Sequence, residues 1–410
     1  MFHEVCEELD RRRHVTLGFE RIERLLNLLG KPERGLRIVQ VVGTNGKGTT
    51  AVAIASALET LGFTSGAYLS PHVLSYTERV MIRGRFITEE DFAGAMGETI
   101  ALADANGVPA SQFELLTAGA IKLFHDAGLD FAVLEAGLGA RHDATSAAPA
   151  EAVVLTNVSL DHTEYLGETV EEISREKLAS LRPGATLFLG TGDPAVLNVA
   201  RGVAASVKAR TVELPPEEER RKPDRGAEAG LPPYAEGNVR LGVLVAENIT
   251  GRDLGWEERE RVARSVAGVL PARFEVHEVR GVPVVVDGGH NAAGIEAALG
   301  GVRRLYGSRP LGLIFGVLRD KDAARMLAAL AGEVDLIVIT RPLSDRAAEP
   351  EAVADELRRV RAGDPRSLVV TYAGDALEVA VEEMRRVDGV VLVTGSLYTG
   401  AAVLGALREG

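Results

Sequence analysis

The sequence predicts an α/β protein with two doubly wound domains, each built on a mostly parallel sheet. Short β-branched runs alternate with apolar segments of helical period, which is typical of a parallel sheet covered on both faces. This alternation restarts from Pro271. In addition, 410 residues exceed what one hydrophobic core usually serves. We therefore expect two domains, over residues 1–269 and 270–410.

The elements follow in order along the chain. Residues 14–35 carry apolar side chains at helical spacing and close in Gly30-Lys31-Pro32, which predicts a helix. Thr88 followed by three acids predicts a helix N-cap, and an apolar helix follows from Gln112. Asn238 to Val269 again has a helical pattern. The predicted strands cover 38–42, 66–69, 131–134, 152–157 and 185–189 in the first domain, and 282–286, 311–317, 336–340, 368–371 and 390–394 in the second.

Composition limits the possible partners and the compartment. The formal net charge of −13 argues against a nucleic-acid partner. The single cysteine, Cys6, excludes an intrachain disulfide and indicates a reducing compartment. No run of about 18 apolar residues is present, so we expect no membrane partner and a cytoplasmic protein. We also expect a monomer. Residues 213–234 are rich in Pro, Glu, Arg and Gly, which predicts a solvated loop.

The stretch from Ile38 to Thr50 predicts a phosphate-binding loop. A β-branched strand stops at Gly43 and leads into a small-residue helix. Glycines let the backbone approach an anion, and N–H groups at a helix N-terminus favour it. The Lys47 ammonium can meet phosphate oxygens, and the hydroxyl of Thr49 or Thr50 can reach Mg²⁺. The candidate nucleotide-binding residues here are Thr44, Asn45, Gly46, Lys47, Gly48 and Thr49.

Polar residues follow three further predicted strands, where ligands gather in parallel sheets. They are Ser70, Glu135 and His162. A carboxylate, a hydroxyl and an imidazole suit a Mg²⁺ ion that also binds nucleotide phosphates. Taken singly, a glutamate or histidine at a strand end is more often a hydrogen-bonded structural residue. Their position beside the phosphate loop favours the metal site.

Several motifs in order resemble folylpolyglutamate synthase and the bifunctional dihydrofolate synthase, a branch of the Mur ligase superfamily. The resemblance spans nearly the whole chain except residues 213–234. It rests on Gly43-Thr44-Asn45-Gly46-Lys47-Gly48-Thr49, Ser70-Pro71-His72, Thr77-Glu78-Arg79-Val80, Phe113-Glu114-Leu115-Leu116-Thr117, Leu134-Glu135-Ala136-Gly137-Leu138-Gly139, Asp161-His162-Thr163, Glu176-Lys177, Asp287-Gly288-Gly289-His290-Asn291 and Asp320-Lys321-Asp322.

The resemblance implies a P-loop ATPase domain followed by a smaller Rossmann-like ligase domain, and it implies roles for matching residues. Lys47 and its loop would hold Mg–ATP, with Ser70, Glu135, His162 and Thr49 at the metal. Lys177 matches a lysine that the family carbamylates; the alternative is an unmodified cation on a helix surface. The further residues implied are Asn238, Arg273, Asp287 and His290 at the nucleotide, and Thr16, Leu17, Gly18, Phe113, Glu114, His142 and Asp143 at the pterin.

The leading hypothesis is an ATP-dependent ligase that joins glutamate to a folate or dihydropteroate carboxylate. The acceptor carboxylate would attack the γ-phosphate of ATP to form an acyl phosphate, and the amino group of glutamate would then displace phosphate. In this hypothesis Lys47, Glu135, His162 and Lys177 form the catalytic set. Two alternatives remain open, a Mur-type ligase with a different acid and amino acid, and a P-loop switch protein that binds nucleotide to control a partner.

Overall fold

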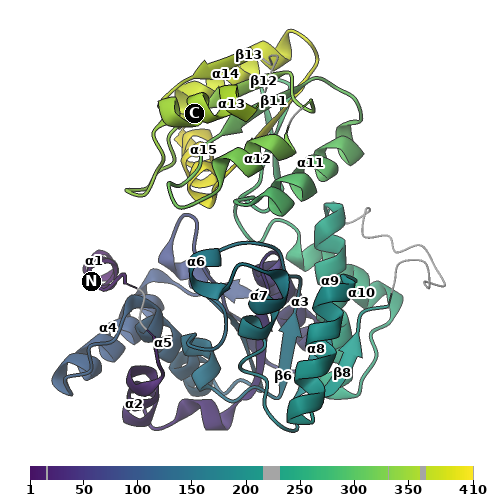
Figure 1. The fold of residues 1–410 in the computed structure, drawn as a ribbon. Helices are drawn as coiled ribbons and strands as arrows, with labels where there is room; N and C mark the ends of the chain where they lie inside the picture. Colours follow the sequence, from purple (N-terminus) through teal and green to yellow (C-terminus); the bar gives the residue numbers. More distant parts are fainter. Residues whose placement is uncertain (15–16, 216–230, 331, 361–365, 410) are drawn as a thin grey trace. The chain divides into compact units, whose positions relative to one another are not determined.

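The computed structural model describes residues 1–14, 17–215, 231–330, 332–360 and 366–409. These residues form two compact units (Figure 1). The first comprises residues 1–230 and 235–267, and the second comprises residues 231–234 and 268–410. Most of the predicted loop over 213–234 lies outside the described residues, as does Thr16. Within the described residues, no helix is long and apolar enough to cross a membrane.

The first unit is built on an eight-stranded sheet in the order β4-β3-β2-β5-β1-β6-β7-β8. The β2–β3 and β3–β4 pairs are antiparallel and the other pairs are parallel, so the predicted mostly parallel sheet is confirmed. The strands are β1 (Arg37–Val42), β2 (Ser65–Tyr68), β3 (Val80–Ile82), β4 (Arg85–Phe86), β5 (Phe131–Glu135), β6 (Ala152–Leu155), β7 (Thr186–Leu189) and β8 (Arg210–Glu213).

Helices cover both faces of this sheet. The helices are α1 (Phe2–Arg11), α2 (Glu20–Leu28), α3 (Lys47–Thr60), α4 (Glu89–Ala105), α5 (Gln112–Asp126), α6 (Thr163–Leu166), α7 (Val170–Lys177), α8 (Pro194–Val207), α9 (Pro233–Thr250) and α10 (Trp256–Val266). Three short 3₁₀ turns add η1 (Pro32–Gly35), η2 (Tyr76–Arg79) and η3 (Ala144–Ala147). Helix α3 packs on β1, β2 and β5 from one side with α10 against it, while α5 packs on β2 and β5 with α1, α2 and α4 around it.

Alternation along β1 explains the two faces. Ile38 belongs to the core formed with α4 and α5, whereas Val42 belongs to a second core formed with α7 and α8. Because the side chains of a strand alternate between its faces, Val39 and Val41 point to the opposite side, where α3 lies. All four side chains are buried. A strand buried on both faces is a near-continuous apolar run, which is why this one could be predicted from its residues.

The second unit is built on a six-stranded sheet in the order β13-β12-β11-β14-β10-β9. Only the β9–β10 pair is antiparallel among the described strands. Phe315 and Ile339 face α11, α12 and α13 in one core, and α14 and α15 pack on the strands from their other side. The elements are β9 (Glu275–Val279), β10 (Val282–Val286), α11 (Ala292–Tyr306), β11 (Leu311–Phe315), α12 (Ala323–Ala329), β12 (Leu336–Ile339), α13 (Pro350–Val360), β13 (Arg366–Val369), α14 (Ala373–Arg385), β14 (Val390–Thr394) and α15 (Leu397–Glu409).

Candidate nucleotide and acceptor site

The predicted phosphate loop is a tight turn between β1, which ends at Val42, and α3, which begins at Lys47. Gly46 has φ +78°, a left-handed conformation that glycine adopts without steric cost. A methyl group at Gly43 would lie 1.9 Å from the Thr156 hydroxyl oxygen. The turn therefore requires glycine at both positions.

The segment after β6 supports this loop through hydrogen bonds. Asn45 donates its backbone N–H to Asn157 Oδ1 at 3.0 Å, and the Thr156 hydroxyl donates to the Asn45 carbonyl at 2.8 Å. The Thr44 N–H donates to the Asn157 carbonyl at 2.9 Å. These bonds hold the loop in one conformation. Sequence reasoning placed Thr156 and Asn157 in a strand and missed their role as supports, although a polar pair ending an apolar strand is a usable signal.

Two lysines converge on the phosphate loop. Lys47 Nζ donates to the Thr44 carbonyl at 3.2 Å, and Lys177 Nζ donates to the Gly43 carbonyl at 2.8 Å. Lys177 is only 5% exposed, so the alternative of a surface cation is wrong. Burial, followed by the positive charge of Lys47, lowers the pKa of Lys177 to about 7. The amine of Lys177 is thus available in its neutral form near neutral pH.

The candidate metal ligands Ser70 and Glu135 meet at the ends of β2 and β5. The Ser70 N–H donates to Glu135 Oε2 at 2.8 Å, and Glu135 is 3% exposed. Of the two hydroxyls in the first turn of α3, that of Thr50 is inaccessible, which leaves Thr49 as the candidate. His162 caps α6 in a left-handed conformation, its side chain is 36% exposed, and its N–H donates to Asp161 Oδ1 at 3.0 Å.

The donor chemistry at this edge fits Mg²⁺. No group of three or more His, Cys, Asp or Glu side chains that could hold a metal occurs in the part of the chain that the structure describes. Mg²⁺ is usually held by one or two carboxylates, with substrate phosphates and water completing its shell. The Glu135 carboxylate, with Ser70 bound to it, supplies such a ligand at the edge of the sheet that carries the phosphate loop. A closed protein cage, as for structural zinc, is excluded within the described residues.

Asn238 lies directly against the phosphate loop. A methyl group at Gly46 would lie 2.5 Å from Asn238 Nδ2, so the two residues are in close contact. The helix that carries Asn238 also approaches α3 closely, because a methyl group at Gly242 would lie 2.6 Å from the Cβ of Ala53. The structure thus places Asn238 beside the phosphate loop, while the nucleotide contact that the resemblance implies for it stays a prediction.

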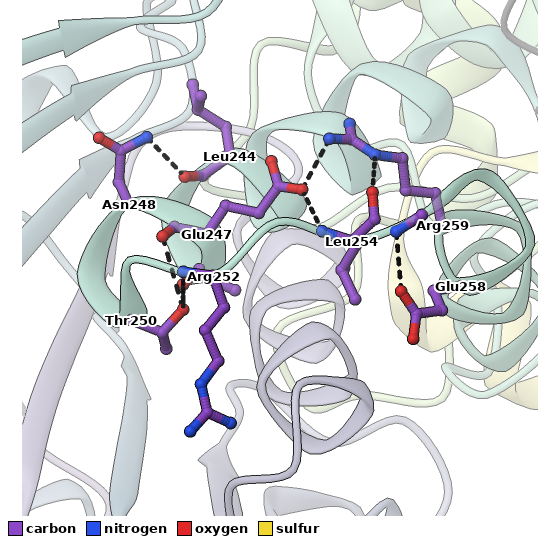
Figure 2. A network of polar contacts seen from close by, with 10 residues as sticks. Leu244, Glu247, Asn248, Thr250, Arg252, Leu254, Glu258 and Arg259 are labelled. Carbon is purple, nitrogen blue, oxygen red and sulfur yellow. Dashed lines mark hydrogen bonds and ion pairs between the residues drawn. The ribbon is translucent and has the colours of Figure 1, made fainter.

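A polar network fixes the end of α9 to α10 (Figure 2). Glu247 Oε1 accepts from the Leu254 N–H at 2.8 Å and from Arg259 Nη2 at 2.6 Å. Arg259 Nε donates to the Leu254 carbonyl at 3.1 Å. Figure 2 shows Glu247 pointing across the connection to both partners. This network holds α9 at a defined position, and Asn238 with it.

The candidate pterin residues divide into two groups. Phe113 packs on Tyr68 with ring centroids 5.8 Å apart, and His142 is exposed with its ring 6.5 Å from Phe19. Glu114 instead accepts from the Ser111 N–H at 2.8 Å and pairs with Arg21 at 3.0 Å, so it caps α5. Leu17 is 67% exposed and Gly18 has φ +94°.

Asp143 is buried and is bonded within its own loop. Its Oδ2 accepts from the N–H groups of Gly137 and Leu138 at 2.8 and 3.0 Å. Its Oδ1 accepts from the N–H and the hydroxyl of Thr145 at 3.0 and 2.6 Å. Burial raises the pKa of this carboxyl. These bonds give Asp143 a role in shaping the loop, and a direct contact with the pterin stays a prediction.

We expect Asp143→Ala to destabilise the first unit by about 3 kcal/mol, because it leaves buried N–H groups without an acceptor. The midpoint of thermal unfolding should fall by several degrees. The exposed Asp253→Ala variant is the matched control and should unfold like the wild type. An unchanged midpoint for Asp143→Ala would show that the four bonds do not support the fold.

The second unit presents its candidate residues after β10 and before β9. Asp287 is buried, and its Oδ1 accepts from the Gly289 N–H at 2.9 Å while its Oδ2 accepts from the Tyr234 hydroxyl. Burial raises the pKa of Asp287. Arg273 stands between Ala272 and Phe274, both with left-handed φ, at +51° and +56°.

The partners of Asp287 and His290 lie in the same unit. His290 Nδ1 donates to the Gly288 carbonyl at 3.1 Å, which fixes the proton of the neutral ring on Nδ1. Tyr234 was missed by sequence reasoning, because it falls in the segment that was interpreted as a solvated loop. An aromatic residue within a polar run is the signal that could have found it.

Comparisons with known proteins agree with this arrangement. Residues 41–213 match the family model of the Mur ligase middle domain, and residues 272–397 match that of the Mur ligase glutamate ligase domain. The dihydrofolate synthase/folylpolyglutamate synthase of Escherichia coli is 31% identical over 95% of this chain and 91% of its own length. A probable bifunctional folylpolyglutamate synthase/dihydropteroate synthase of Haloferax volcanii is 34% identical over 95% of this chain, which spans about half (48%) of that relative.

Solved structures match over the whole chain. The E. coli FolC structure in complex with DHPP and ADP superposes with a TM-score of 0.85 at 26% identity, covering 100% of this chain and 98% of that one. A bifunctional folylpolyglutamate synthase/dihydrofolate synthase with Mn, AMPPNP and L-glutamate bound superposes with a TM-score of 0.81 at 28% identity, covering 99% and 98%.

Proposed function

We propose a set of site residues for this chain, which belongs to the dihydrofolate synthase/folylpolyglutamate synthase family of Mur ligases. The chain is an ATP-dependent ligase that adds glutamate to folate or dihydropteroate. The observation that carries the site is the phosphate loop with Ser70 and Glu135 beside it at the carboxyl edge of one sheet. One or both of the two acceptors are substrates of this chain.

The nucleotide phosphates bind the first turn of α3. Gly46, Lys47, Gly48 and Thr49 form this cradle, while Thr44 and Asn45 use their N–H groups to hold the loop. Asn238, pressed against Gly46, contributes a nucleotide contact. Arg273, Asp287 and His290 supply nucleotide contacts from the second unit. Asp287 acts with Tyr234, whose hydroxyl it binds.

Ser70, Glu135, His162 and the Thr49 hydroxyl hold Mg²⁺, for which manganese stands in a relative's structure. The ion supplies charge neutralisation at the phosphates. Lys47 adds a second positive charge at the same oxygens, where charge develops as the γ-phosphoryl group transfers. Glu135 is held by the Ser70 N–H, so the carboxylate is in position before the nucleotide binds.

The reaction proceeds by two displacements. The acceptor carboxylate attacks the γ-phosphorus and ADP leaves, giving an acyl phosphate. The neutral amino group of glutamate then attacks the acyl carbon, phosphate leaves with the bonding pair, and the amine loses a proton. Phe113, His142, Leu17 and Gly18 contact the pterin-linked acceptor, with Thr16 expected beside them. Glu114 and Asp143 act as positioning residues, because their carboxylates hold the loops of that site.

Lys177 carries a carbamate, which places a negative charge beside Lys47 where the unmodified ammonium would be positive. A neutral amine is the species that reacts with CO₂, and burial lowers the pKa of Lys177 to about 7. The neutral fraction exceeds one half above that pH and falls as the pH drops through 7. The charge of Lys47 at the same loop favours an anion at position 177.

We expect protein in ¹³C-bicarbonate at pH 8 to show a carbamate signal in its ¹³C spectrum. That signal and part of the activity should be lost as the pH falls below about 7 or when CO₂ is removed. The Lys208→Ala variant should keep the signal, since Lys208 lies at the C-terminus of α8, whereas Lys177→Ala should lose it. A signal that persists in Lys177→Ala would contradict this assignment.

The function is tested by coupled release of ADP and phosphate. With Mg–ATP, release should require both glutamate and a pterin acceptor, either dihydropteroate or tetrahydrofolate. If the wild-type protein shows no turnover with dihydropteroate and none with tetrahydrofolate, the proposal is overturned. A panel of other acids and amino acids would then identify a different Mur-type ligase. Tight nucleotide binding with slow turnover that no amino acid stimulates would instead indicate a nucleotide switch.

A further inference from the structure

Arg79 is a buried cation without an acidic partner among the described residues. Its residue exposure is 7%, and it is the last residue of η2. Its Nε donates to His72 Nδ1 at 2.9 Å, and its guanidinium lies 5.9 Å from the centroid of the Tyr76 ring. No described Asp or Glu forms an ion pair with it. Burial of an unpaired charge is costly, so such groups are rare unless a ligand supplies the counter-charge.

Two acidic residues around η2 accept hydrogen bonds from groups other than Arg79. Both carboxylate oxygens of Glu78 accept backbone N–H groups, from Val73 at 2.7 Å and from Leu74 and Ser75 at 2.9 Å. Asp10 accepts from the Tyr76 hydroxyl at 2.6 Å. Arg13 contributes a second positive charge near His72. Glu78 and Asp10 therefore bind other groups, and neither forms an ion pair with Arg79.

A second buried polar group lies beside Arg79. Tyr68 is fully buried, and its hydroxyl lies near the Thr117 hydroxyl and the Arg79 guanidinium without a hydrogen bond of normal geometry. Burial raises its pKa to about 12, and the positive charge of Arg79 opposes that shift. Tyr68 also packs against Phe113, a candidate acceptor residue, and is close enough to Asp143 for that charge to act on it.

The position of Arg79 connects the acceptor residues with the metal ligands. The Leu69 N–H donates to the Arg79 carbonyl at 2.8 Å, so Arg79 lies opposite the residue that precedes Ser70. Tyr68 pairs with Val80 in the antiparallel β2–β3 ladder. Through its backbone Arg79 is one residue from Ser70, and through Tyr68 it is one side chain from Phe113.

We propose that Arg79 binds the reacting carboxylate of the pterin-linked acceptor, with His72 as the positioning residue that holds its Nε. This inference rests on the proposed ligase function and extends it to the recognition of the acceptor. Nη1 and Nη2 of the guanidinium form the two-pronged donor that matches a carboxylate. The bond between Nε and His72 fixes the plane of that donor.

A purely structural role for Arg79 makes a different prediction. If Arg79 only supports the loop at His72, its removal weakens every acceptor equally, whatever its charge. If Arg79 binds the carboxylate, its removal weakens only an acceptor that carries one. Two probes separate these cases, dihydropteroate and its analogue with a carboxamide in place of the benzoate carboxylate.

The experiment measures binding of both probes to the full chain with Mg²⁺ and a non-hydrolysable ATP analogue. We expect Arg79→Met to weaken dihydropteroate at least about tenfold, the range of one charge-assisted pair, and the carboxamide less than about twofold. Arg79→Lys should recover part of the loss, because it keeps the charge but not the fork. Equal weakening of both probes, or no weakening of dihydropteroate, would overturn the proposal.

Two controls distinguish a failure of the Arg79 proposal from a failure of the ligase function. Arg85→Met, on the exposed edge strand β4, should leave both affinities unchanged. Wild-type turnover that depends on pterin and glutamate establishes the ligase, so an Arg79 result against the proposal leaves that function standing. If Arg79→Met does not fold, Arg79→Lys gives the same comparison, with a smaller selective loss expected.

Discussion

Lys47→Ala should lower kcat by about a thousandfold or more while the protein stays folded. The reason is that Lys47 is the side-chain cation of the phosphate turn, and loss of one preorganised charge at a transferring group costs on this order. The Lys47 ammonium donates to the Thr44 carbonyl of the same loop at 3.2 Å. The loop itself is held by Thr156 and Asn157, which the substitution leaves in place.

The measurement is ADP release in the presence of glutamate and the active pterin acceptor. Lys122→Ala is the matched control, because Lys122 forms a pair with Asp126 on the exposed side of α5. It should keep wild-type turnover. Retained turnover in Lys47→Ala, with the control also active, would remove Lys47 from the catalytic set.

Glu135→Ala should abolish turnover, and Glu135→Gln should separate the two functions of this side chain. The carboxylate both accepts from the Ser70 N–H and offers charge to Mg²⁺. A glutamine oxygen can still accept that N–H but carries no charge. We therefore expect Glu135→Gln to keep the wild-type unfolding temperature, lose turnover by about a hundredfold or more, and need a higher Mg²⁺ concentration.

A Mg²⁺ titration of turnover is the test, with circular dichroism to establish folding. Glu98→Gln, on the exposed face of α4, controls for loss of one negative charge and should titrate like the wild type. A Glu135→Gln variant with an unchanged Mg²⁺ requirement would place the metal on other residues.

Sequence reasoning succeeded where the signal is local in the backbone. The strand, glycine turn and helix around Lys47 follow from β-branched residues, a left-handed glycine and small helical residues, all within one short stretch. Ser70 and Glu135 could be paired because the ends of parallel strands meet at one edge of a sheet, and β2 and β5 are neighbours.

The sequence does not reveal the hydrogen bonds that a site carboxylate makes to nearby backbone groups. Glu114 and Asp143 stand at matching positions, yet each carboxylate binds N–H groups that a turn or loop brings within reach, and no spacing rule reveals those bonds. Lys177 was ambiguous for a related reason. Its burial depends on the loop at Gly43, which is distant in sequence, so a helical position alone could not decide between surface and core.

The burial of Lys177 lowers the stability of the folded enzyme and at the same time provides the neutral amine. The folded state holds the amine at a pKa of about 7 whereas the unfolded chain keeps it near 10.5, so the unfolded chain binds the proton more tightly. The resulting cost to folding is fully present below pH 7 and disappears as the pH rises toward 10.5. A methionine of similar length would remove this cost and the reactive amine together. The residue that supplies the reactive amine is thus also one that lowers the stability of the fold below pH 7.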